Sequence, residues 1–245
     1  MKEGEKKELY SKIEERVLEI VNKYMIEIEG IYLIGSYARG EHEKDSDIDV
    51  LVITEETNNK ITAGKYSIKL VSLPKVLKLL RTKPLKIYTM LCEAKPLMNY
   101  HLITHLRHKK VLKKHILSYV PELKSLIRSN SPFVVTSKKD SAAALDFMMK
   151  RLREIFFMVD MLDTKLVYSR VEFIKWLRKE SDFSREDFKI IIDAFYKTKR
   201  NKLPEKMINQ EVIDKLYNFL EYEVGKYHQL RKKYSKSKAR ISIVH

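Results

Sequence analysis

Hydrophobic and polar positions follow two different periods along the first hundred residues. Between residues 9 and 24, apolar side chains recur every three or four positions with lysine and glutamate between them, which predicts an amphipathic helix. Three short apolar runs with the length of buried strands follow at residues 31–34, 48–53 and 66–73. Pro74 stands where a second helix begins, and residues 85–91 are strand-like but ambiguous. The pattern predicts a small mixed sheet with helices packed against it.

The second half of the chain has a different character. Beyond Pro96, long stretches with helical spacing replace the short apolar runs, and few turn residues interrupt them. We therefore expect an α+β fold, with a small mixed-sheet domain at residues 1–105 and an all-helical bundle domain with a basic C-terminal tail at residues 106–245. The helices predicted for the bundle cover residues 141–168, 170–179, 184–199 and 209–234.

The charge of the chain bears on its partners. A net charge of +16 favours a polyanionic partner such as RNA, DNA or a nucleotide. Lysine and glutamate are both abundant, so a thermophile-like surface with excess lysine is an equal alternative. The tail in particular either grips phosphates or is only solvated. The predicted nucleic-acid contacts lie in two basic segments: Arg107, Lys109, Lys110, Lys113 and Lys114, and Arg231, Lys232 and Lys233.

Several classes of protein are disfavoured by the sequence. No stretch approaches the roughly 18 apolar residues of a membrane span, and the first residues are charged where a signal peptide would become apolar. The single cysteine, Cys92, can form neither an internal disulfide nor a zinc site built on thiolates. We expect a soluble cytoplasmic protein without a membrane partner, and a protein partner or homo-oligomer stays open.

Two short motifs, separated by ten residues, carry the candidate chemistry. Gly35 lets the backbone approach a phosphate at the end of a strand, and Ser36 opens a helical turn whose N–H groups and hydroxyl can hold anionic oxygens. Arg39, about one turn later, adds a cation for the same phosphates. Asp47 and Asp49 lie two apart on a predicted strand, so both carboxylates leave one face and suit a magnesium ion. A simple Asp-Ser-Asp turn explains them less well, because carboxylates beside an apolar strand are costly unless ligated or solvated.

The combination of Gly35-Ser36 with Asp47-x-Asp49 resembles the signature of the DNA polymerase β nucleotidyltransferase superfamily. The likeness is greatest to its minimal nucleotidyltransferase branch and covers about residues 28–98. It implies that Gly35, Ser36 and Arg39 bind a triphosphate, while Asp47 and Asp49 are catalytic and hold Mg²⁺ or Mn²⁺. The implied reaction moves a nucleoside monophosphate (NMP) from an NTP to an acceptor hydroxyl. RNA is slightly favoured as acceptor over a protein or a small molecule.

One position departs from the family pattern. The family carries a third carboxylate on the next strand, and Lys69 stands at the matching place within Ile68-Lys69-Leu70-Val71. A protonated ammonium neither binds a metal nor accepts the proton of the attacking hydroxyl. Either another acid substitutes, or the chain is a weakened module that binds RNA, a nucleotide or a partner protein. A third reading is one half of a toxin and antitoxin pair that modifies its partner. The candidate substitute acids are Glu93, Asp140 and Glu154.

Overall fold

The computed structural model describes residues 3–131, 133–163, 169–199 and 202–241, with side chains omitted at residues 3, 199 and 234–241. The chain divides into two compact units, residues 1–111 and residues 112–245. The division falls slightly beyond the predicted boundary between residues 105 and 106. The reason is that helix α5 (Tyr100–Arg107) runs through that point and packs against the sheet of the first unit.

The first unit is built on a mixed sheet of five strands in the order β3-β4-β2-β1-β5. The central strand β2 pairs antiparallel with β1 and parallel with β4. These three are the strands predicted from apolar runs, whereas the edge strands β3 and β5 have too few apolar residues to be predicted. The strands are β1 (Ile28–Ile34), β2 (Ile48–Thr54), β3 (Asn59–Ala63), β4 (Tyr66–Ser72) and β5 (Lys95–Met98).

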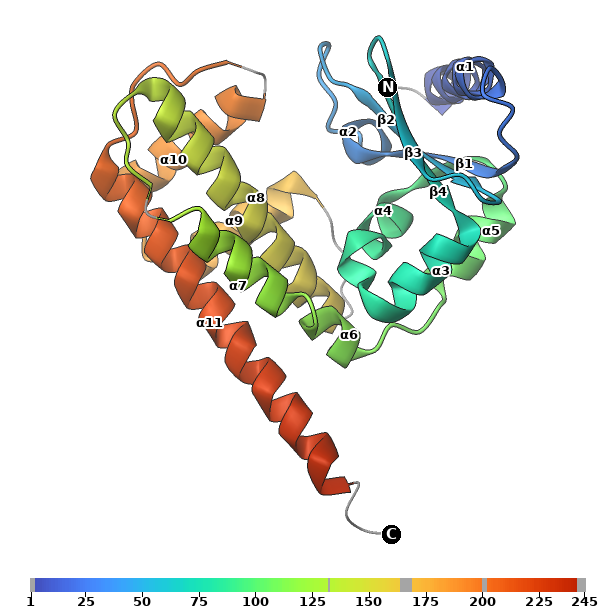
Figure 1. The fold of residues 1–245 in the computed structure, drawn as a ribbon. Coiled ribbons are helices and arrows are strands. Elements are labelled where there is room, and N and C mark those ends of the chain that lie inside the picture. Colours follow the sequence, from blue (N-terminus) through green and yellow to red (C-terminus); the bar gives the residue numbers. More distant parts are fainter. Residues whose placement is uncertain (1–2, 132, 164–168, 200–201, 242–245) are drawn as a thin grey trace. The chain divides into compact units, whose positions relative to one another are not determined.

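Helices cover both faces of this sheet (Figure 1). On one face, α1 (Glu3–Asn22) buries Ile13 and Val17 against Val50 and Ile68. The other face carries α3 (Leu73–Thr82), the 3₁₀ turn η1 (Pro84–Lys86), α4 (Tyr88–Glu93) and α5. Residues 85–91, ambiguous in the sequence, are therefore mostly helical. The α+β class predicted for the chain is confirmed.

The second unit is all helical in its described parts, as predicted. Its centre is the long helix α8, whose apolar stripe, including Leu145, Met148 and Leu152, is fully buried. The hydroxyls of Ser169 and Ser184 accept N–H bonds in the first turns of α9 and α10, which explains where these helices begin. Among the described residues, no helix is long and apolar enough to cross a membrane. The helices are α6 (Lys113–Leu117), α7 (Val120–Ser129), α8 (Lys138–Asp163), α9 (Arg170–Glu180), α10 (Arg185–Lys199) and α11 (Gln210–Ile241).

Candidate active site

The two sequence motifs meet at one end of the sheet. Ile34, the last residue of β1, pairs with Asp49 of β2, so the turn that follows β1 lies directly against this carboxylate. Gly35 enters the short helix α2 (Gly35–Arg39) with φ +70°, a conformation that favours glycine. A Cβ atom on Gly35 would lie 2.6 Å from Oδ2 of Asp49. The site therefore needs a glycine both for its backbone and for the space that Asp49 occupies.

The two aspartates differ in their surroundings. Asp47 is exposed just before β2, whereas Asp49 is half-buried as its second residue. Burial raises the pKa of Asp49, and the negative charges of Asp47 and Glu93 raise it further. The hydroxyl of Ser67 and the ammonium of Lys60 oppose this shift only in part. The site thus concentrates negative charge that the described residues do not fully neutralise.

A third carboxylate, that of Glu93, reaches the same place from the end of α4. Its Oε1 accepts a hydrogen bond from the Gly35 backbone N–H at 3.1 Å, and its Oε2 accepts one from the Arg39 guanidinium. Arg39 also donates from Nε to Glu41 at 2.9 Å. The side chains of Arg39 and Glu93 are both only 12% exposed. Two of the donors predicted for a triphosphate are therefore bound by a carboxylate of the chain itself. Ser36 is half-buried beside them.

The sheet register places Ser67, and not Lys69, beside Asp49. Strands β2 and β4 run parallel, with Asp49 opposite Ser67 and Leu51 opposite Lys69. Lys69 thus lies two residues farther along the strand, or roughly 6.6 Å, and its Nζ contacts the sulfur of Met90 at 3.6 Å. Burial, with help from neighbouring lysines, lowers the pKa of Lys69. The β4 side chain beside Asp49 is therefore a neutral hydroxyl.

The other acids considered as substitutes have roles of their own in the second unit. Asp140 caps the start of α8 by accepting from the hydroxyls of Thr136 and Ser137 at 2.7 and 2.8 Å. Glu154 accepts from the hydroxyl of Tyr119 at 2.9 Å. Across the described part of the chain, no three or more His, Cys, Asp or Glu side chains are grouped to hold a metal ion.

Comparison with known proteins agrees with this geometry. The family model of the nucleotidyltransferase domain matches residues 11–118, which include the whole sheet and both motifs. Residues 11–118 form a nucleotidyltransferase domain. The resemblance inferred from Gly35-Ser36 and Asp47-x-Asp49 is thus confirmed, and domains of this family transfer NMP groups. No curated protein sequence matches the chain.

Comparison with solved structures gives two further similarities. One is a spectinomycin adenyltransferase from Enterococcus faecialis, with ATP and spectinomycin; it is 14% identical, with a TM-score of 0.49 over 81% of this chain and 92% of that one. The other is a nucleotidyltransferase-like protein from Exiguobacterium sibiricum, also 14% identical, with a TM-score of 0.34 over 89% of this chain and 77% of that one. Identities this low say nothing about substrate.

Arg107 supports the nucleotidyltransferase domain from within. Its Nε donates to the carbonyl of Leu91 at 2.7 Å, and its guanidinium also donates to the carbonyl of Ala94. These bonds hold the end of α4, and so the backbone on either side of Glu93. The remaining basic residues predicted as nucleic-acid contacts in this region are exposed and divided between the two units: Lys109 and Lys110 in the first, Lys113 and Lys114 in the second.

Glu93→Gln is expected to tighten NTP binding about threefold to tenfold. The substitution removes the charge-assisted bond that occupies Arg39, and it removes a negative charge that repels the triphosphate. Binding is measured by isothermal titration with a non-hydrolysable ATP analogue. Glu41→Gln is the matched control, because Glu41 also binds Arg39 but not the Gly35 N–H. Weaker binding in Glu93→Gln would show instead that Glu93 is a scaffold that the turn needs.

Proposed function

We propose that the nucleotidyltransferase domain transfers an NMP from an NTP to an acceptor hydroxyl, with release of pyrophosphate, in a reaction that requires Mg²⁺ or Mn²⁺. The observation that carries this proposal is the contact between Gly35 and Asp49. A turn suited to phosphates lies directly against a half-buried carboxylate, as phosphoryl chemistry requires.

The acidic pair fits a magnesium ion. A half-buried carboxylate whose pKa is raised by burial and by like charges, as at Asp49, gains stability from a cation. Magnesium is commonly held by one or two carboxylates together with substrate phosphates, so Asp47 and Asp49 suffice without a preformed third ligand. A bound ion would neutralise the charge of the phosphates and the charge that develops on the leaving pyrophosphate.

The other residues of the turn have the task of positioning the triphosphate. Ser36 supplies a hydroxyl and Arg39 a guanidinium, both from the short helix that begins at Gly35. Because Glu93 binds Gly35 and Arg39, an arriving triphosphate replaces one anion with another. The binding energy of the nucleotide is thereby reduced by the cost of releasing Glu93. Positioning of the reacting groups is the larger part of catalysis in this class of reaction.

The residue opposite Asp49 on β4 is Ser67, whose neutral hydroxyl is a weak acceptor for the proton of the attacking hydroxyl, and the nearby carboxylate of Glu93 is bound by Gly35 and Arg39. We therefore expect a slow enzyme.

Ser67→Asp should tighten magnesium binding and raise turnover about tenfold, while lowering the melting temperature of the metal-free protein through added charge repulsion. Lys69 lies two residues farther along β4, so Lys69→Asp should change magnesium affinity and turnover much less. Metal titration and NTP turnover are measured for both variants, with Ser67→Asn as the uncharged control. The comparison tests whether Ser67 or Lys69 lies beside the acidic pair. A stronger effect of Lys69→Asp would contradict the register.

A second candidate is a catalytically silent module that binds RNA, a nucleotide or a partner protein. The observation that favours it is the carboxylate of Glu93 on the Gly35 N–H, together with the neutral Ser67 opposite Asp49. The net charge of +16 supports RNA as the acceptor in the first case and as the ligand in the second. Arg231, Lys232 and Lys233 are the basic residues of α11 that would contribute to such a contact.

Incorporation from labelled nucleotides separates the two candidates. The full chain is incubated with each labelled NTP, with Mg²⁺ or Mn²⁺, and with total RNA, cell protein or a small-molecule extract. We expect metal-dependent labelling in one fraction, most strongly in RNA, and none with Asp47→Asn. Absence of labelling in every fraction with every NTP would favour the silent module. Labelling that Asp47→Asn retains would contradict the site assignment.

A further inference from the structure

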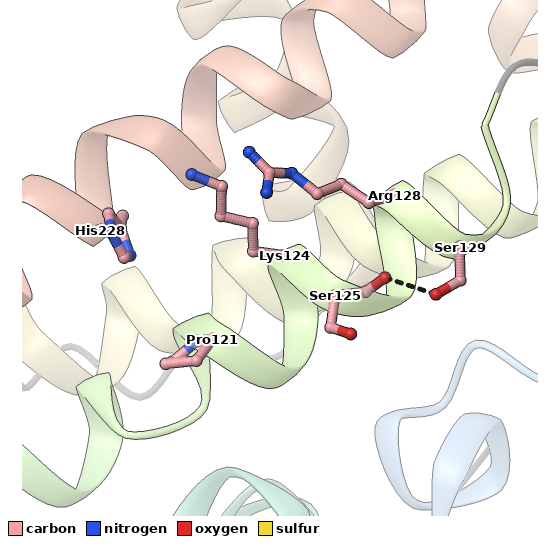
Figure 2. Close-up of a pocket in the computed structure, with 6 residues that line it drawn as sticks. All are labelled: Pro121, Lys124, Ser125, Arg128, Ser129 and His228. Atoms are coloured by element: carbon pink, nitrogen blue, oxygen red, sulfur yellow. Dashed lines mark hydrogen bonds between the residues drawn. The ribbon is translucent and has the colours of Figure 1, made fainter.

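The second unit contains a basic pocket that the proposed transfer reaction does not use. It lies between α7 and α11 and has a volume of about 430 Å³. Figure 2 shows its lining, in which the side chains of Lys124 and Arg128 extend from α7 toward α11, where His228 lies. The lining residues are Pro121, Lys124, Ser125, Arg128, Ser129 and His228.

The chemistry of this lining is that of an anion site. Lys124 and Arg128 are one turn apart on α7, so they share a face, and none of the six lining residues is acidic. No described carboxylate forms an ion pair with either side chain. The Ser129 hydroxyl donates to the Ser125 carbonyl at 2.9 Å, which leaves the exposed hydroxyl of Ser125 as a further donor at the pocket. Cations and a hydroxyl that converge without a carboxylate suit a phosphate group.

His228 adds a second, independent indication. Its Nδ1 atom is buried and, among the described residues, has no hydrogen-bond partner. Burial lowers the pKa of His228, and the charges of Lys124, Lys232, Arg231 and Arg128 lower it further. A buried nitrogen without a partner and a crowd of like charges are both costly to the folded protein. A bound anion would relieve both costs, because it accepts a hydrogen bond and neutralises the repulsion.

We propose that the pocket between α7 and α11 binds a backbone phosphate of a nucleic-acid strand. The extent of the basic surface favours a strand over a free phosphate ion. Arg231 and Lys232 follow His228 by about one turn of α11, so basic side chains continue beyond the pocket, as in grooves that track a polynucleotide backbone. Binding of the strand requires neither NTP nor transfer, so this inference stands or falls separately from the proposed function.

The test is RNA binding by the full chain without NTP or metal. The double variant Lys124→Gln with Arg128→Gln removes two cations, and glutamine keeps the helix propensity of α7. Binding of a labelled single-stranded RNA about 20 nucleotides long is followed by fluorescence anisotropy between about 50 and 200 mM salt. We expect the affinity to fall about tenfold, and the slope of log affinity against log salt to decrease in magnitude by about 1.4, or 0.7 for each lost contact. His228→Gln should weaken binding as well, by a smaller factor.

The matched control removes the same charge elsewhere in the second unit. Lys139 and Lys189 are exposed on α8 and α10 and do not line the pocket. Lys139→Gln with Lys189→Gln should leave the affinity within about twofold and the salt slope nearly unchanged. Circular dichroism and melting curves verify that all variants are folded. Equal affinities and equal salt slopes for the pocket variant and the control would overturn the proposal. Failure of the unmodified protein to bind RNA would overturn it as well.

Discussion

Asp49→Asn is expected to abolish NMP transfer while it raises the melting temperature of the metal-free protein. The loss of activity follows from the loss of a charged ligand for the metal and should reach roughly a thousandfold. The gain in stability follows from burial, which raises the pKa of Asp49 and so makes its ionised form unfavourable in the folded state. Asparagine carries no charge, so the variant avoids this cost.

The pH dependence gives this first prediction a distinctive signature. Because the folded protein binds the Asp49 proton more tightly than the unfolded chain, the penalty is present in full above the raised pKa. It disappears as the pH falls through that value toward the ordinary aspartate pKa of 3.8. The melting temperature of Asp49→Asn should therefore exceed that of the unmodified protein near about pH 7, and the difference should shrink in acid.

Differential scanning fluorimetry in the presence of a chelator measures this difference, and labelled-NTP turnover measures the activity. Asp45→Asn is the control, since Asp45 is an exposed aspartate in the loop before β2. It should affect neither quantity. Retained turnover in Asp49→Asn would show that Asp49 is not a catalytic residue. A melting temperature below that of the unmodified protein at neutral pH would show that the ionised Asp49 side chain stabilises the fold.

Gly35→Ala is expected to lower both stability and turnover. An alanine at φ +70° costs about 1–2 kcal/mol in backbone conformation alone. The added Cβ would also lie 2.6 Å from Oδ2 of Asp49, so the carboxylate or the turn must move. Displacement of a catalytic group by about 1 Å can cost a hundredfold in rate, and the combined loss of stability should lower the melting temperature by about 5 °C or more.

Gly64→Ala isolates the steric part of this effect. Gly64 also has a positive φ, +57°, but a Cβ atom there meets nothing within 4 Å. The Gly64→Ala variant carries the same kind of backbone strain but adds no contact near the acidic pair. Its turnover should stay normal, while its melting temperature should fall modestly. If Gly35→Ala and Gly64→Ala behave alike in both assays, the close approach of Gly35 to Asp49 has no part in the activity.

The sequence alone indicates that the two motifs of the candidate site lie together, because the determinants of this contact are local. Gly35-Ser36 ends one apolar run, and Asp47 and Asp49 begin the next, so two neighbouring strands are enough to bring them together. Strand β4 was also predicted from its apolar residues. Its register against β2 was not, because parallel pairing depends on β3 and on the whole sheet. For that reason the sequence alone does not show that Ser67, and not Lys69, pairs with Asp49.

Side-chain contacts between residues far apart in the chain could not be predicted from the sequence. Glu93 lies 58 residues from Gly35, and its position depends on α4, whose sequence could equally have formed a strand. The sequence offers Glu93 only as one of three candidate substitute acids, and nothing in the sequence indicates its bonds to Gly35 and Arg39. Arg107 was predicted as a nucleic-acid contact because basic residues surround it. Its two backbone acceptors depend on tertiary structure alone.

Under the proposed function, the carboxylate of Glu93 is a tethered competitor of the triphosphate for the turn at residues 35–39. Because it belongs to the same chain, its effective concentration beside Gly35 and Arg39 is fixed and high, on the order of millimolar or above. A small anion such as inorganic phosphate, present at a similar concentration, gains little by exchanging with it. A triphosphate that arrives with a divalent cation has several more contacts with which to displace it, including the acidic pair through the cation. We therefore expect the turn to exclude small anions and to bind a triphosphate that arrives with its own counterion.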